Sequence, residues 1–327
     1  MNINNVEHFE TWFDIGEGTR DEDFFKERRF LGGWTVSDRH PVVGLKRHKH
    51  DISLIHDSVI DCSIEELREI LESIILDYAE DNNALFLSGG KDSTTLAHIL
   101  KKLDIPFVPV SLHSTNAVTT EYDVVKQIEK ELDIEVQYVQ LDHIPEVDFK
   151  YWVENPYTAK CIAIERLGLQ DHIIFTGEVG TGEMQVNQPL LYTAQMGYRP
   201  DDLARWHVNV CGSYRKNNAV RRTSQDEIYL ECVRYFRSRL EEWDKHPDIL
   251  NRVMFGRLQE EGSYRLFNYS VDKYNWCHPF AETDFIYRCV NMPSRFKGSK
   301  NLYREMYPEL TDIPWRYPKS GLGIPTV

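Results

Sequence analysis

The sequence predicts an α/β fold with a doubly wound parallel sheet, and two features of its pattern lead to that prediction. From residue 84 onward, short apolar runs alternate with helical stretches, which is the order of consecutive strand–helix–strand units. The first run, residues 84–87, is apolar throughout, as expected for a strand buried on both faces of a parallel sheet. A glycine turn then leads from this strand into a helix.

The other elements follow in the order that such a sheet requires. A helix begins at Ser63, because Ser63 and Glu66 form a capping box before an apolar stripe. A later helix follows Pro156, since proline is favourable in a first helical turn. The elements expected beyond the helix of the glycine turn span residues 107–112 (strand), 119–132 (helix), 136–141 (strand), 157–167 (helix) and 172–176 (strand).

Composition excludes several classes of protein. No apolar run of the 327 residues is long enough to span a membrane, and the N-terminus lacks a secretion signal, so we expect a cytoplasmic protein. The six cysteines contain no C-x-x-C pair and are expected to be buried thiols. A net charge of −14 argues against a protein that grips nucleic acid over a wide surface.

Positive charge gathers near the C-terminus. Residues 288–319 contain seven basic and three acidic residues, in a chain that is otherwise strongly acidic. Such a segment suits an anionic ligand, although a solvated basic face would give the same count.

The turn after the first strand is suited to bind a polyphosphate. Its backbone N–H groups gather at a helix N-terminus, and Gly89 and Gly90 allow a ligand to approach the backbone. Asp92 would repel phosphate unless a divalent cation lay between them, so we expect Asp92 to bind Mg²⁺. The hydroxyl donors of the turn are Ser88, Ser93 and Thr94. An ordinary glycine turn between a strand and a helix is the alternative.

This turn is not a Walker A loop. That pattern needs Ser or Thr directly after its lysine and a first glycine six residues before it, whereas Asp92 follows Lys91 and Leu85 holds the earlier position. The run Ser-Gly-Gly-Lys-Asp-Ser instead resembles the PP-loop of the ATP pyrophosphatase superfamily, whose members cleave ATP to AMP and pyrophosphate. The resemblance implies a sheet of the PP-loop (adenine nucleotide alpha hydrolase-like) type, with ATP and Mg²⁺ as cofactors.

Two further strand ends are expected to face the ligand, because ligands of such sheets bind beyond the carboxyl ends of the strands. Leu112 ends the second strand and should contact the nucleotide through its backbone. The strand at 172–176 runs into a loop that contains Gly177, Glu178 and Glu183. These two acids suit a metal ligand, a general base or both, and a plain glycine loop with exposed acids is the alternative.

Over residues 63–326 the chain resembles the synthetase domain of the asparagine synthetase family, whose relatives include β-lactam synthetases and lasso-peptide cyclases. The resemblance places the family's catalytic acid on Glu178, assisted by Glu282 within a Pro-Phe-Leu-Asp-like element, and the pyrophosphate-contacting lysine on Lys319. Lys300 and Arg304 match its Lys-x-x-x-Arg helix. The residues thus expected to contact the nucleotide are Ser88, Gly89, Gly90, Lys91, Asp92, Ser93, Thr94, Leu112, Gly177, Lys300 and Arg304.

The chain departs from that family in two ways. Its acid loop is one residue longer and lacks the family's Asp, so Glu183 is expected to replace that metal ligand. It also lacks a glutaminase domain, since Asn2 stands where a nucleophilic Cys would follow the initiator Met. The nitrogen would therefore come from free ammonia, from a separate ammonia donor or from an amine; a homo-oligomer is also left open.

The resemblance implies an AMP-forming ligase that adenylates a small-molecule or peptide carboxylate and transfers it to ammonia or an amine. We divide the chain into an N-terminal appendage (1–62), a nucleotide-binding core (63–189) and a helical substrate region whose tail returns to the active site (190–327). One alternative is a PP-loop enzyme that modifies tRNA or a nucleobase, such as a thiolase or a deazapurine nitrile synthase. Another is an ATP- or AMP-binding module without turnover.

Overall fold

We describe the fold from a computed structural model of the whole chain. The chain divides into two compact units, and the unit that concerns us comprises Cys62–Gln185, Leu266–Cys289 and Ser299–Val327. The residues that the structure describes are 62–113, 121–141, 156–178, 274–297 and 301–310, with the single positions 43, 230, 233, 234, 237, 238 and 241.

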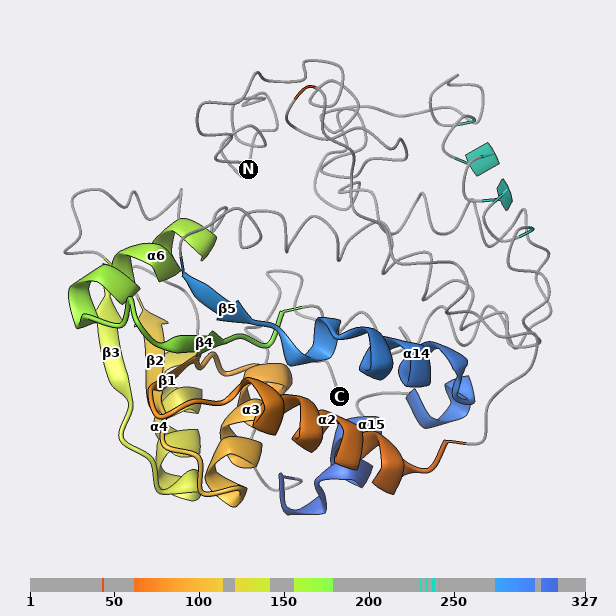
Figure 1. Cartoon of the computed structure of the whole chain (residues 1–327), viewed down its shortest axis with the longest axis horizontal. Helices are drawn as coiled ribbons and strands as arrows, with labels where there is room; N and C mark the ends of the chain where they lie inside the picture. The colour runs from red at the N-terminus through yellow and green to blue at the C-terminus, as the bar shows by residue number, and fades with distance from the viewer. Residues whose placement is uncertain are drawn as a thin grey trace. The chain divides into compact units, whose positions relative to one another are not determined.

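A five-stranded parallel sheet forms the centre of this unit (Figure 1). The strand order is β3-β2-β1-β4-β5, and each neighbouring pair runs parallel. The strands are β1 (Asn83–Phe86), β2 (Val108–His113), β3 (Gln137–Gln140), β4 (Ile173–Phe175) and β5 (Asn275–Cys277). The predicted α/β class with a parallel sheet is confirmed.

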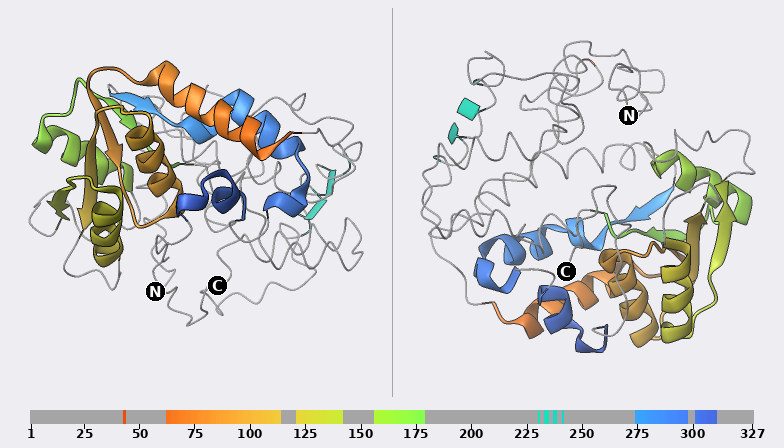
Figure 2. Two further views of the ribbon diagram at one scale, coloured as in Figure 1. Left: turned by 90° about the horizontal axis from the view of Figure 1, so that it is seen from below. Right: turned by 180° about the vertical axis from the view of Figure 1, so that it is seen from behind.

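Helices cover both faces of the sheet. In Figures 1 and 2, α3 (Lys91–Lys102) and α4 (Glu121–Leu132) lie on one face, whereas α6 (Pro156–Leu167) lies on the other. The chain winds outward from β1 through β2 to β3, then crosses the sheet by way of α6 to reach β4. This is the doubly wound arrangement that the alternation of elements predicts.

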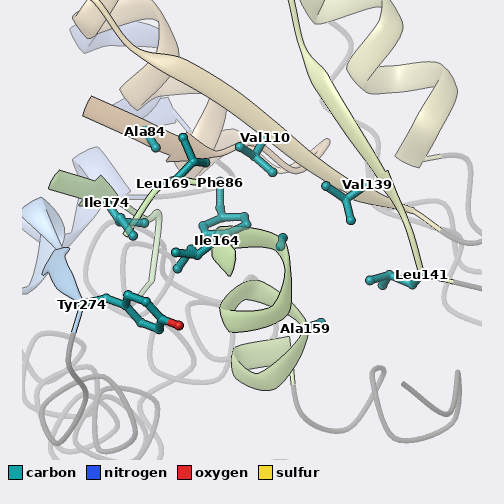
Figure 3. Close-up of a cluster of buried hydrophobic side chains, with 11 residues drawn as sticks. Ala84, Phe86, Val110, Val139, Leu141, Ala159, Ile164, Leu169, Ile174 and Tyr274 are labelled. Atoms are coloured by element: carbon teal, nitrogen blue, oxygen red, sulfur yellow. The ribbon is translucent and has the colours of Figure 1, made fainter. Parts of the chain in front are cut away.

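Apolar side chains fill the space between the sheet and α6 (Figure 3). Ala84 and Phe86 of β1 pack there with Ala163 and Ile164 of α6. Because side chains alternate along a strand, the neighbouring Leu85 points to the opposite face, which α3 covers, and it is also fully buried. The continuous apolar run of β1 therefore reflects burial on both faces.

A second group of elements packs beside the sheet. α2 (Ile64–Tyr78) contacts both η6 (Pro279–Ala281) and α15 (Asn301–Met306). Its capping box is confirmed: Ser63 Oγ accepts from Glu66 N at 3.0 Å, and Glu66 Oε2 accepts from Ser63 N at 2.9 Å. The other described elements are α14 (Thr283–Asn291), η8 (Pro308–Leu310), which contacts α15, and η7 (Ser294–Lys297), which belongs to the other compact unit.

Two local predictions need correction. The turn after β1 is shorter than the predicted range of 88–92, because α3 begins at Lys91 with Gly90 as its N-cap, which places Asp92 in the first helical turn. Strand β5 was not predicted, since only three residues pair with β4 and a run this short carries no alternation. None of the described helices has the length and apolar character of a membrane span.

Candidate functional site

The candidate site lies where the strand order reverses. The chain leaves β1 toward β2 on one side, and β4 lies on the other side of β1. In parallel α/β sheets, the crevice beyond the carboxyl ends of two such strands is the preferred ligand position. The turn after β1 holds the Ser-Gly-Gly-Lys-Asp-Ser run, and the turn after β4 holds Gly177 and Glu178.

These two turns are in direct contact. A Cβ atom on Gly177 would lie 2.7 Å from Ser93 N and 2.9 Å from Asp92 Cβ, so the turn after β4 packs against the first turn of α3. No side chain fits between them without a shift of backbone, because Ser93 N cannot rotate away. The structure therefore brings together two segments that the sequence analysis singled out separately.

Hydrogen bonds from hydroxyl groups stabilise the turn after β1 internally. Ser93 Oγ accepts a hydrogen bond from Ser88 N at 3.0 Å, and Thr94 Oγ1 donates one to Gly90 O at 2.8 Å. Gly90 N in turn donates to Ser88 Oγ at 3.2 Å. Ser93 and Thr94 are buried, whereas Ser88 is exposed. The hydroxyls expected to face phosphate thus also hold the turn in a preformed shape.

A buried polar group lies beneath this turn. Lys91 is fully buried, and its Nζ lies 3.5 Å from Asp92 Oδ1 and 4.8 Å from the ring centroid of Tyr303. The hydroxyl of Tyr303, on α15, donates to Asp92 Oδ1. Tyr303 was not predicted from the sequence, although its position between Lys300 and Arg304 was an available signal. Arg304, the next residue along α15, is exposed.

A second ion pair lies at the turn after β4. Lys160 of α6 and Glu178 approach to 2.7 Å between Nζ and Oε1, and their side chains are 12% and 18% exposed. Lys160 Nζ also lies 5.8 Å from the ring centroid of Phe86, at the end of β1. Lys160 was not predicted from the sequence, because a helical lysine that contacts a distant loop has the same local pattern as one that faces solvent.

A histidine that follows β5 supports the same turn. His278 Nδ1 and Thr176 Oγ1 are hydrogen-bonded at 2.6 Å, and Glu178 N donates to Thr176 Oγ1 at 3.4 Å. Burial lowers the pKa of His278 to about 4; the carboxylate of Glu178 opposes this shift and the ammonium of Lys160 reinforces it. The imidazole is therefore neutral at pH 7.

Glu282 contacts a different element. Tyr78, the last residue of α2, donates its hydroxyl to Glu282 Oε1 at 2.9 Å, and this hydrogen bond raises the pKa of Tyr78 to about 12. The contact described for Glu282 is thus with α2, whereas Glu178 contacts α6.

The remaining predicted residues divide into two groups. Leu112 is half-buried on β2 and packs against the apolar cluster under α6. Glu183, Lys300 and Lys319 lie outside the described residues.

Asp92 is the carboxylate of this turn that could hold a cation. Among the described residues, no three His, Cys, Asp or Glu side chains gather in the manner of a metal cage. Mg²⁺ does not require a cage, because it takes one or two protein carboxylates and completes its shell with phosphate oxygens and water. A single carboxylate in the first turn of α3 fits that chemistry.

Comparison with known proteins finds solved structures that are similar at low sequence identity. No family model and no curated protein matches the sequence. One similar solved structure is the U34-tRNA thiolase NcsA from Methanococcus maripaludis with its 4Fe-4S cluster, 15% identical over 63% of this chain and 76% of that chain, with a TM-score of 0.29. Another is the NMN synthetase from Francisella tularensis, 12% identical over 56% of this chain and 96% of that chain, with a TM-score of 0.31. Similarity at this level transfers neither protein's activity to the chain.

Proposed function

We propose that this protein is a PP-loop enzyme that cleaves ATP to AMP and pyrophosphate in order to form an amide bond. It adenylates a substrate carboxylate and transfers the acyl group to ammonia or an amine. The observation that carries the proposal is the contact of Gly177 with the first turn of α3. Because of this contact, the turn after β1, which would bind phosphate, lies next to the turn that contains Glu178, which would act as a base. Both turns lie where the strand order of the sheet reverses.

The turn after β1 would bind the phosphates of ATP. Its glycines have no Cβ that would keep a ligand from the backbone, and the N-terminal N–H groups of α3 favour an anion. Asp92, together with Glu183, would hold Mg²⁺, which neutralises charge on the departing pyrophosphate. Lys300, Arg304 and Lys319 would supply further positive charge to the same leaving group.

Glu178 would act on the nitrogen nucleophile. As the amine attacks the acyl-adenylate, a C–N bond forms, the bond from the acyl carbon to the AMP oxygen breaks, and the amine loses a proton to Glu178. Lys160 holds the Glu178 carboxylate at 2.7 Å before the substrate arrives. A substrate carboxylate that draws the Lys160 ammonium toward itself would release Glu178 for this task, with Glu282 as the second acid of the region.

The expected partners follow from this chemistry. The substrates would be a small-molecule or peptide carboxylate and an amine or ammonia, with a separate ammonia donor or a second copy of the chain as protein partner. The net charge of −14 argues against a nucleic-acid substrate, and the compartment would be the cytoplasm.

ATP–pyrophosphate exchange tests the proposal. A panel of carboxylic acids and short peptides is offered, and exchange is expected with a restricted set of them. Asp92→Asn should lower exchange by about 100-fold or more, because it removes a charge that is needed in the transition state. Asn is chosen over Ala because it preserves an acceptor for Tyr303 beside the buried Lys91.

The matched control is Asp104→Asn, at the far end of α3, where a positive φ of 54° suits Asn as well as Asp. This control should retain wild-type exchange. Full exchange by Asp92→Asn would refute the role of Asp92. Failure of the wild-type protein to bind ATP or an ATP analogue in calorimetry would refute the proposed function itself.

A further inference from the structure

We infer that Tyr303 is a positioning residue of the nucleotide site, which keeps the Asp92 carboxylate available to Mg²⁺ by preventing a closer ion pair with the buried Lys91 ammonium. This inference rests on the proposed function, because it concerns the cation that accompanies ATP. It adds a residue of α15, 211 positions along the chain from Asp92, to the turn after β1.

The contacts of Tyr303 join both charges of the pair. Its hydroxyl donates to Asp92 Oδ1, while the face of its ring lies 4.8 Å from Lys91 Nζ. Tyr303 and Lys91 are both fully buried. Phe280 packs edge-on against the Tyr303 ring at 6.3 Å between centroids, so the ring is held from a second side.

Lys91 is a competitor for any cation that Asp92 binds. A buried ammonium next to a carboxylate gains strongly from a close ion pair, because the surroundings screen it little. Yet Nζ and Oδ1 are 3.5 Å apart, longer than a normal charge-assisted hydrogen bond. The Tyr303 hydroxyl occupies Asp92 Oδ1, and its ring provides the ammonium with a favourable cation–π contact instead. One side chain thus contacts both charges, and the ion pair between them stays longer than a direct hydrogen bond.

Calorimetric titration with a non-hydrolysable ATP analogue tests this role without relying on turnover. Each protein is titrated in Mg²⁺ and again in EDTA. The Kd in EDTA divided by the Kd in Mg²⁺ measures the Mg²⁺-dependent part of binding. Tyr303→Phe removes the hydroxyl and keeps the ring. It should reduce this ratio by about 10- to 100-fold, the usual loss when a partner of a metal-binding side chain is removed, and leave the Kd in EDTA unchanged.

Tyr307→Phe is the matched control. Tyr307 lies one turn further along the chain and is also fully buried, but its hydroxyl donates to Glu72 of α2 at 3.3 Å. Its removal should leave both Kd values as in the wild type. A loss of equal size in Tyr307→Phe would show that any buried hydroxyl of this region suffices, and would overturn the inference.

Removal of the competitor provides a second, independent arm. If Tyr303 acts by keeping Lys91 from Asp92, then adding Lys91→Met to Tyr303→Phe should restore the Kd ratio at least tenfold, and should also relieve any loss of thermal stability. A wild-type ratio in Tyr303→Phe, or no restoration by Lys91→Met, overturns the inference while the proposed function stands. Absence of analogue binding by the wild-type protein in either buffer overturns the proposed function instead.

Discussion

Gly177→Ala is the sharpest perturbation of the candidate site. The added Cβ would lie 2.7 Å from Ser93 N, 2.9 Å from Asp92 Cβ and 3.0 Å from Asp92 C. These atoms belong to the first turn of α3 and cannot rotate out of the way. Restoring ordinary contact requires the two turns to separate by about 0.7 Å.

Two consequences follow from that separation. Overpacking of this kind should lower the free energy of unfolding by about 1–3 kcal/mol. A displacement approaching 1 Å between the turn after β1 and Glu178 should lower ATP–pyrophosphate exchange by about 100-fold. Urea denaturation measures the first quantity, and exchange with the accepted carboxylic acid measures the second.

Gly168→Ala separates loss of stability from loss of function. Gly168 follows α6 with a φ of +69°, and nothing lies within 4 Å of its added Cβ. Alanine at this position should lower the free energy of unfolding by about 1–2 kcal/mol through backbone strain alone. We expect this variant to lose stability similarly and keep wild-type exchange. Equal exchange in Gly177→Ala and Gly168→Ala would refute the contact between the two turns as the basis of the site.

Three further predictions concern the surroundings of the site. Lys160→Met should lower the free energy of unfolding by about 3–5 kcal/mol, because it removes the ammonium that is paired with the Glu178 carboxylate. Adding Glu178→Gln should recover part of this loss, as measured by urea denaturation. Additive losses in the double variant would contradict the pairing. The pKa of His278, about 4, lies below its value in the unfolded chain, so the folded protein binds fewer protons than the unfolded chain. The free energy of unfolding should therefore fall by about 3 kcal/mol as the pH drops from about 6.5 to 4. His278→Asn should flatten this pH dependence, and an unchanged slope would exclude His278 as its source. Ser63→Ala should lower the free energy of unfolding by about 1 kcal/mol, and a stability equal to the wild type would show that the capping box contributes nothing.

Local patterns in the sequence determined the framework of this protein. Residues 84–87, the two glycines and the periodic helix predict a strand, a turn and a helix because each signal depends on neighbours a few positions apart. The capping box at Ser63 is local in the same way, and it is confirmed. The order of strands and helices then implied a parallel sheet, and with it the edge at which a ligand would bind.

Only the tertiary structure decided what surrounds the candidate residues. Tyr303 contacts Asp92 across 211 positions of the chain, and β5 pairs with β4 from about 100 residues further along. Sequence patterns relate residues only a few positions apart, so they predict neither contact. Lys160 meets Glu178 because α6 crosses to the far face of the sheet before β4 returns to it. Such contacts depend on how whole elements pack, and packing depends on the shape and burial of side chains that are distant in sequence. The sequence could therefore propose the acids and glycines of the site, whereas the partners that orient them required the fold.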